Sequence, residues 1–175
     1  MGCDIHTYLE VKVYKDEQRT NGVWANQDLW IRNTDRDRYP EFNDERKYEI
    51  SDELWGSRWY YLFAVLAGVR NAWDITPISE PKGFPDDAGE ETIEMYNHWS
   101  SDAHSSSWLT LKELTEWSGW EEIDHPVDDK RTRREILEEF HEKTIARMKS
   151  HLKEHHFKQY EIRPEDIRMV FWFDN

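Results

Sequence analysis

Two Asp-x-His pairs are the residues of this chain best suited to chemistry. Asp4 and His6 stand near the amino terminus, and Asp102 and His104 repeat the spacing in the middle of the chain. Residues two apart in a β-strand leave the same face, so each pair can present a carboxylate beside an imidazole. Such a pair can bind a metal ion or act as a general acid and base. An exposed aspartate next to a hydrogen-bonded histidine would give the same pattern.

A further carboxylate, Asp174, stands at the end of an apolar stretch near the carboxyl terminus. Burying it unpaired would be costly, and a cation would offset that cost. We therefore predict one polar site with a divalent metal ion, such as zinc, manganese or magnesium, whose ligands are Asp4, His6, Asp102, His104 and Asp174. In the acid–base alternative, the catalytic residues are His6, His104 and Asp102.

Other polar side chains are candidates for binding a ligand at the rim of this site. Two of them end an apolar helix and one lies beside Gly83 in a proline-rich loop. The other three belong to a serine-rich segment. A cation beside an exposed backbone N–H suits an anion, as does a segment next to a helix N-terminus. The alternatives are a helix cap, a stiff connector and a low-complexity serine loop. The candidates are Arg70, Asn71, Lys82, Ser105, Ser107 and Trp108.

The amino-terminal half must position these residues. Residues 5–13 alternate in polarity, which predicts a strand that begins almost at the first residue. Asn21-Gly22 is a strong turn signal, and residues 23–32 are the expected return strand of a hairpin. Residues 33–51 are highly charged and are expected to form a solvated loop or an excursion from the fold.

Two helices and a final strand complete the expected fold. Residues 59–70 have the pattern of a buried helix, and residues 128–157 that of a long amphipathic helix. On the latter, His151 and His155 are four apart and offer an alternative metal site. Residues 167–174 are apolar on both faces, which favours a central strand. We predict an α+β (or α/β) fold over residues 1–175 as one domain, with the hairpin and the last strand in a small sheet packed by both helices.

Composition excludes several classes of protein. The chain has 175 residues, a net charge of -14 and 14% aromatic residues, so a compact core is feasible although only 37% of residues are hydrophobic. The negative charge argues against a duplex nucleic-acid or anionic-membrane partner. The single cysteine, Cys3, rules out an intrachain disulfide and a Cys-based zinc cluster. No segment resembles a signal peptide or a membrane span, so we expect a cytoplasmic protein.

Four segments of the chain resemble a family of small proteins encoded by tailed phages and prophages. They are the opening Met-Gly-Cys-Asp-Ile-His, the closing Val-Phe-Trp-Phe-Asp-Asn, and the segments 60–71 and 102–109. The loop at residues 81–86 is similar too, with Lys82 where arginine is usual and Phe84 where leucine is usual. That exchange weakens a bidentate phosphate contact there. The resemblance implies a phage origin, a place in the bacterial host cell and a shared polar site, but no particular reaction.

Three functions fit these features. The first is metal-assisted or acid–base hydrolysis of a small phosphorylated or nucleotide-like molecule, as in a phosphodiesterase. The second is a protein that sequesters such an anionic ligand, with Trp and Tyr stacking on a base, in defence of the phage against its host. In the third, a His–Asp network only holds two segments together. The chain could also form a homo-oligomer.

Overall fold

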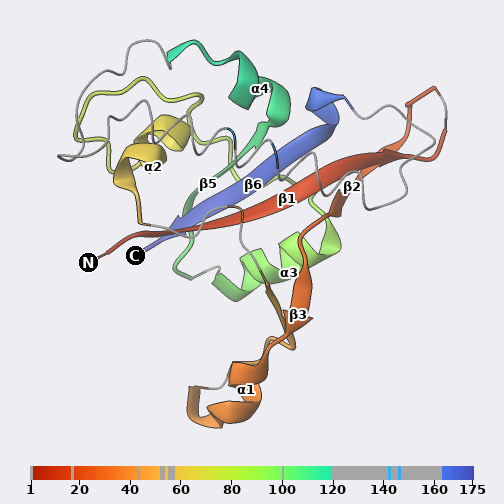
Figure 1. Cartoon of the computed structure of the whole chain (residues 1–175), viewed down its shortest axis with the longest axis vertical. Helices are drawn as coiled ribbons and strands as arrows, with labels where there is room; N and C mark the ends of the chain where they lie inside the picture. The colour runs from red at the N-terminus through yellow and green to blue at the C-terminus, as the bar shows by residue number, and fades with distance from the viewer. Residues whose placement is uncertain are drawn as a thin grey trace.

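A four-stranded antiparallel sheet in the order β2-β1-β6-β5 organises the structure, a computed structural model (Figure 1). The structure describes residues 2–16, 18–42, 44–51, 54, 58–99, 101–119, 142, 146 and 163–175. Within these residues it also contains a two-stranded sheet and four α-helices. The predicted α+β class is therefore confirmed. The predicted helix at residues 128–157, with His151 and His155, lies outside the described residues except for residues 142 and 146.

The two central strands come from the two ends of the chain. β1 (Asp4–Tyr14) pairs antiparallel with β6 (Ile167–Asp174), in a register that runs from Asp4 opposite Asp174 to Val11 opposite Ile167. The amino and carboxyl termini therefore lie side by side at one end of the sheet (Figure 1). β6 also pairs with β5, so the prediction of a central last strand beside the first is confirmed.

Successive side chains of β1 and β6 point to opposite faces of the sheet, so the core has two layers. Residues such as Ile5, Leu9 and Phe171 pack on the side of helices α2 (Tyr60–Ala67) and α4 (Leu111–Glu116). Their neighbours in sequence, such as Tyr8 and Trp172, pack on the opposite side with Met95 of helix α3 (Glu90–Trp99). Figure 1 shows α2 and α4 on one face of the sheet and α3 on the other. None of the described helices is both long and apolar enough to cross a membrane.

The predicted return strand of the hairpin is shorter than expected. β2 (Gly22–Asn26) pairs with β1 as predicted, but the pairing stops at Asn26 rather than continuing to Arg32. Asn26 and Asp28 bond to each other there, because the Asn26 amide donates to an Asp28 carboxylate oxygen and Asn26 Oδ1 accepts from the Asp28 N–H. The same Asp28 oxygen accepts the Leu9 N–H. A side chain rather than the backbone of β2 therefore binds this N–H group of β1, and the ladder of backbone hydrogen bonds ends there.

The chain then leaves the main sheet and forms a projecting arm (Figure 1). β3 (Trp30–Arg32) pairs with β4 (Tyr48–Ile50), and between them lie α1 (Thr34–Arg38) and the 3-10 helix η1 (Pro40–Phe42). Of the two alternatives predicted for residues 33–51, the solvated loop is wrong for these parts, whereas an excursion from the main sheet agrees with the arm. The side chain of Asn33 caps α1 by accepting the N–H groups of Asp35 and Arg36.

The serine-rich segment is a strand rather than a loop. β5 (His104–Thr110) forms the edge of the main sheet next to β6, and Ser106 and Ser107 are buried in it. Three consecutive serines hide the alternation of polar and apolar residues that would have predicted a strand. The polarity of the segment therefore suggested a loop. The capping box that follows is confirmed, since Thr110 Oγ1 accepts the Glu113 N–H and Glu113 Oε2 accepts the Thr110 N–H.

The end of one helix also differs from expectation, whereas the last strand begins at Ile167 as predicted. The helix predicted for residues 59–70 ends at Ala67, because Gly68 adopts the left-handed conformation, with φ of 68°, that closes a helix. At the other end of the chain, the 3-10 helix η3 (Pro164–Asp166) leads directly into β6.

A buried ion pair joins β1 to β6 on the α3 face. Glu10 lies opposite Arg168 and accepts its Nε–H at 2.8 Å, with side chains only 0% and 2% exposed. The other Glu10 oxygen accepts the Gly89 N–H at 2.7 Å, and Arg168 also binds Asp87. The guanidinium centre lies 4.0 Å from the ring centroid of Trp24. The buried charges of Glu10 and Arg168 therefore neutralise each other.

We predict that Glu10→Leu lowers the free energy of unfolding by about 3–5 kcal/mol, because it leaves the buried Arg168 without its main partner. Urea denaturation followed by circular dichroism would measure the loss. The double variant Glu10→Leu/Arg168→Met, which removes both charges, should recover part of it. Asp37→Asn, in the exposed pair with Arg32, is the control and should change little. A double variant less stable than Glu10→Leu would contradict this account.

Candidate functional site

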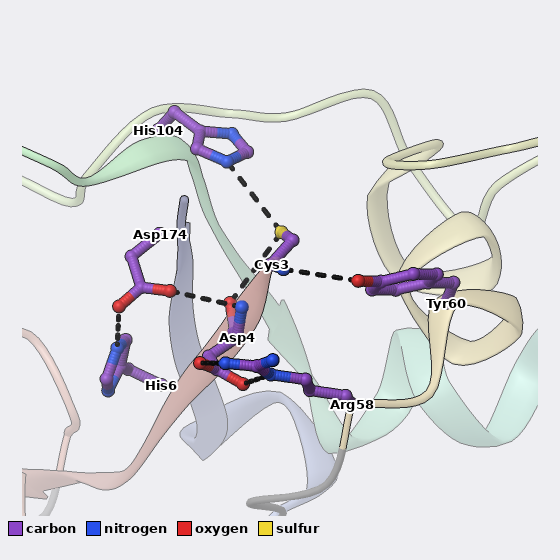
Figure 2. Close-up of polar contacts among 7 residues, drawn as sticks. All are labelled: Cys3, Asp4, His6, Arg58, Tyr60, His104 and Asp174. Carbon is purple, nitrogen blue, oxygen red and sulfur yellow. Dashed lines mark hydrogen bonds and ion pairs between the residues drawn. The ribbon is translucent and has the colours of Figure 1, made fainter. Parts of the chain in front are cut away.

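The candidate site lies at the end of the sheet where the two chain termini meet (Figure 2). β1 and β6 bring Asp4, His6 and Asp174 together from opposite ends of the sequence. Around them lie the neighbouring Cys3 and residues from two other segments, which are Arg58 with Tyr60 and His104.

The central contact is a histidine held by a carboxylate. His6 Nε2 lies 3.2 Å from Asp174 Oδ2, and the backbone N–H of Asp4 donates to the other oxygen of Asp174 at 3.1 Å. The His6 ring packs against Trp99 of α3, with 4.3 Å between the ring centroids. The imidazole is therefore held both by a hydrogen bond and by an aromatic neighbour. This is the arrangement of a base and the group that orients it.

Asp4 is held in turn by Arg58. The guanidinium donates to both carboxylate oxygens of Asp4 (Figure 2), with Nη2 2.6 Å from Oδ2. These hydrogen bonds hold the pKa of Asp4 below its ordinary value of 3.8. Gly2 gives the arginine its room, since an added Cβ at that position would lie 2.5 Å from Nη1 of Arg58. Asp4 is thus an ionised, arginine-bound carboxylate.

Cys3 and His104 form a second pair on the α2 side of the sheet. Cys3 Sγ lies 3.8 Å from His104 Nε2, and His104 Nδ1 lies 3.1 Å from Ser105 Oγ. The Cys3 N–H donates to the hydroxyl of Tyr60 on α2. Burial raises the pKa of the Cys3 thiol, although Arg70 opposes that effect. A fully buried, protonated thiol of this kind is unreactive at neutral pH.

A β-bulge determines the side on which His104 lies. His104 is opposite Phe173 and Ser107 is opposite Phe171, so three steps along β5 match only two along β6. Ser105 takes the left-handed conformation there, with φ of 48°. The extra residue places the His104 ring beside that of Phe173, at 6.0 Å, on the α2 face. His6 leaves the opposite, α3 face, so the two histidines do not face each other.

The structure therefore brings only part of the predicted set together. Asp4, His6 and Asp174 are joined, and His104 is near them but on the other face. Asp102 lies in an exposed turn before β5, where its N–H donates to the carbonyl of Trp99, and it has no contact with the other four. Among the described residues, no three His, Cys, Asp or Glu side chains are grouped so that they could hold one metal ion. The metal site stays a prediction.

The predicted rim residues also separate. Arg70 donates to Asn175 Oδ1 and lies close to the site. Asn71 instead closes a local turn with Ile75, and Lys82 contacts Glu113 and the ring of Trp108. The remaining two candidates, Ser105 and Ser107, bond to His104 and to the Lys82 N–H, respectively. Lys82, Ser107 and Trp108 thus form a structural cluster farther along β5.

Sequence reasoning missed three residues of the site. Cys3 adjoins the first Asp-x-His pair, but its place beside His104 depends on the bulge. Arg58 and Tyr60 come from a segment far from either terminus, and only the packing of α2 brings them to Asp4 and Cys3. The one available signal was an arginine directly before a buried helix, which is too common to be informative.

Comparison of the chain with protein-family models, with curated proteins and with solved structures found no match.

We predict that Asp4→Asn destabilises the protein at neutral pH and that the difference in stability between the variant and the wild type disappears in acid. A carboxyl whose pKa is lowered by folding stabilises the fold above its ordinary pKa, and this contribution is lost as the pH falls through the lower, folded-state value. The melting temperatures of the variant and the wild type should therefore converge as the pH falls below 3.8. Asp86→Asn is the matched control, because Asp86 is exposed. A gap that persists unchanged in acid would contradict the role of the Arg58 contact.

Proposed function

We propose that this protein hydrolyses a small phosphorylated or nucleotide-like molecule by acid–base catalysis at the His6–Asp174 pair. The observation that carries the proposal is the 3.2 Å contact between His6 Nε2 and Asp174 Oδ2, in side chains that remain 13% and 14% exposed. A carboxylate on one ring nitrogen fixes the tautomer and leaves the other nitrogen for the substrate. Among the described residues, Nδ1 of His6 has no hydrogen-bond partner.

The proposed reaction follows from this orientation. With Nε2–H donated to Asp174, Nδ1 accepts a proton from a water molecule as the water oxygen attacks phosphorus. The P–O bond to the leaving group breaks, and the leaving oxygen takes the proton back from the imidazolium. Asp174 stabilises the imidazolium while the proton is on the ring.

The surroundings suit an anionic ligand with an aromatic part. Arg70 and the exposed part of Arg58, which is itself paired with Asp4, place two guanidinium groups at the same end of the sheet. Within the described residues, the indole N–H groups of Trp99 and Trp172 are buried without a hydrogen-bond partner. Trp99 is only partly buried, so the exposed part of its ring offers a surface for a base.

These same aromatic contacts support a second candidate function, sequestration without turnover. His6 lies between the rings of Trp99 and Trp172, with centroid distances of 4.3 and 5.8 Å, and a site rich in aromatic rings can hold a base tightly. The resemblance to tailed-phage proteins supports either function in an infected cell, because removing or withholding a nucleotide signal would blunt a host defence.

We predict that the wild type hydrolyses a phosphodiester such as bis(4-nitrophenyl) phosphate or a dinucleotide, and that His6→Asn lowers the rate about a hundredfold or more. His98→Asn, an exposed histidine on α3, is the matched control. Release of nitrophenolate and chromatography of the nucleotide would measure turnover. Equal rates in all three proteins would contradict the proposal. A nucleotide that binds and returns intact after denaturation would establish sequestration instead.

The metal-assisted form of the reaction stays a prediction with its own test. The metal-assisted form requires that protein purified without an affinity tag or chelator contain a stoichiometric divalent metal by elemental analysis, with less of it in His6→Ala and His104→Ala than in His98→Ala. Metal retained in the first two variants would place the ion elsewhere, with His151 and His155 as the next candidates. Absence of metal from the wild type would favour the acid–base form.

A further inference from the structure

A cavity lies away from the candidate site, between the projecting arm and helix α3. It has a volume of about 330 Å³, which suits a small ligand or a single side chain of a partner. Strand β3, the start of β4 and one face of α3 line it. The lining residues are Trp30, Arg46, Tyr48, Glu91, Glu94 and Met95.

Two aromatic side chains form one wall of the cavity. Trp30 pairs with Ile50, and Tyr48 pairs with Arg32 two residues along, so Trp30 and Tyr48 leave the same face of the two-stranded sheet. The indole N–H of Trp30 donates to Asn26 Oδ1 at 3.0 Å, and its ring stacks with Tyr8, which fixes its orientation. Tyr48 is 59% exposed, so its ring is available to a ligand.

The opposite wall is acidic. Glu91, Glu94 and Met95 stand at spacings of three and four residues on α3, which places them on one side of the helix. Met95 is buried and provides an apolar floor. Glu91 and Glu94 are exposed, and among the described residues neither has an ion pair.

Arg46 is the only cation among the described residues that line the cavity, and its charge is already neutralised. Its Nε and Nη2 donate to the two oxygens of Asp44 at 2.9 and 2.7 Å. This contact holds the pKa of Asp44 well below its ordinary value, so the carboxylate stays ionised. The cavity therefore combines aromatic faces, an apolar floor and two unpaired carboxylates.

We propose that this cavity binds the alkylammonium group of an organic cation. A cation over an aromatic face is attracted by the ring, and the attraction is strongest for a weakly hydrated, methylated ammonium. Glu91 and Glu94 supply opposite charge, and the net charge of -14 attracts cations to the molecule as a whole. The group could belong to a free amine or to a methylated lysine of a partner, which offer the same chemistry.

The decisive experiment compares a cation with a neutral molecule of the same shape. The full-length protein is titrated with choline and with 3,3-dimethylbutan-1-ol, and binding is followed by calorimetry or by NMR. A trimethyllysine peptide and the same peptide with leucine at that position form a second pair. Saturable binding is expected for choline or for the trimethyllysine peptide. Whichever of these two cations binds more tightly identifies the source of the ammonium group.

Variants connect any binding to the cavity. Tyr48→Ala should weaken binding between about threefold and thirtyfold, and Glu94→Gln should weaken it too. Glu90→Gln, which removes a charge from the same helix outside the cavity lining, should not. The inference is overturned if neither cation binds, if the neutral molecules bind equally well, or if Tyr48→Ala and Glu94→Gln bind as the wild type does. Because this cavity shares no residue with the His6–Asp174 pair, turnover by the wild type is independent of the result.

Discussion

The pairing of β1 with β6 is the constraint on which the rest of the structure depends. It joins the first strand to the last across the whole sequence, from Asp4 opposite Asp174 to Val11 opposite Ile167. Such non-local pairing is entropically expensive to form, and here it is stabilised by two buried aromatic and aliphatic layers and by the Glu10–Arg168 ion pair between the strands. Both termini come to one end of the sheet as a result.

The two-residue period of a strand explains why chemically different groups lie so close together. Cys3 and Asp4 are neighbours in sequence, yet one faces α2 and the other faces the side of α3. The α2 side is apolar and protects a protonated thiol, whereas the α3 side holds the hydrogen-bonded carboxylates and His6. One bulged residue, Ser105, decides that His104 joins the thiol rather than the carboxylates.

Features that depend on local pattern could be predicted from the sequence. The alternation of β1, the two apolar faces of β6 and the Thr110 capping box were all readable, and so was the proximity of Asp4 and His6 to Asp174. What could not be read were features set by distant contacts. The end of β2 depends on Asn26 and Asp28 bonding back to β1, and the place of Asp102 depends on the turn that precedes β5. No spacing of residues in the sequence predicts the end of β2 or the place of Asp102.

The surroundings of Asp174 revise the physical argument for a cation at this site. A carboxylate at the end of a buried strand needs compensation, and the sequence alone suggested that a metal ion would supply it. In the structure hydrogen-bond donors offset the cost of burying Asp174, because the Asp4 N–H and the His6 ring each bind one of its carboxylate oxygens. Asp4 is neutralised by Arg58 in the same way. The site can therefore keep two carboxylates beside a histidine without a metal ion, and in the reaction that we propose Asp174 would stabilise the positive charge on His6.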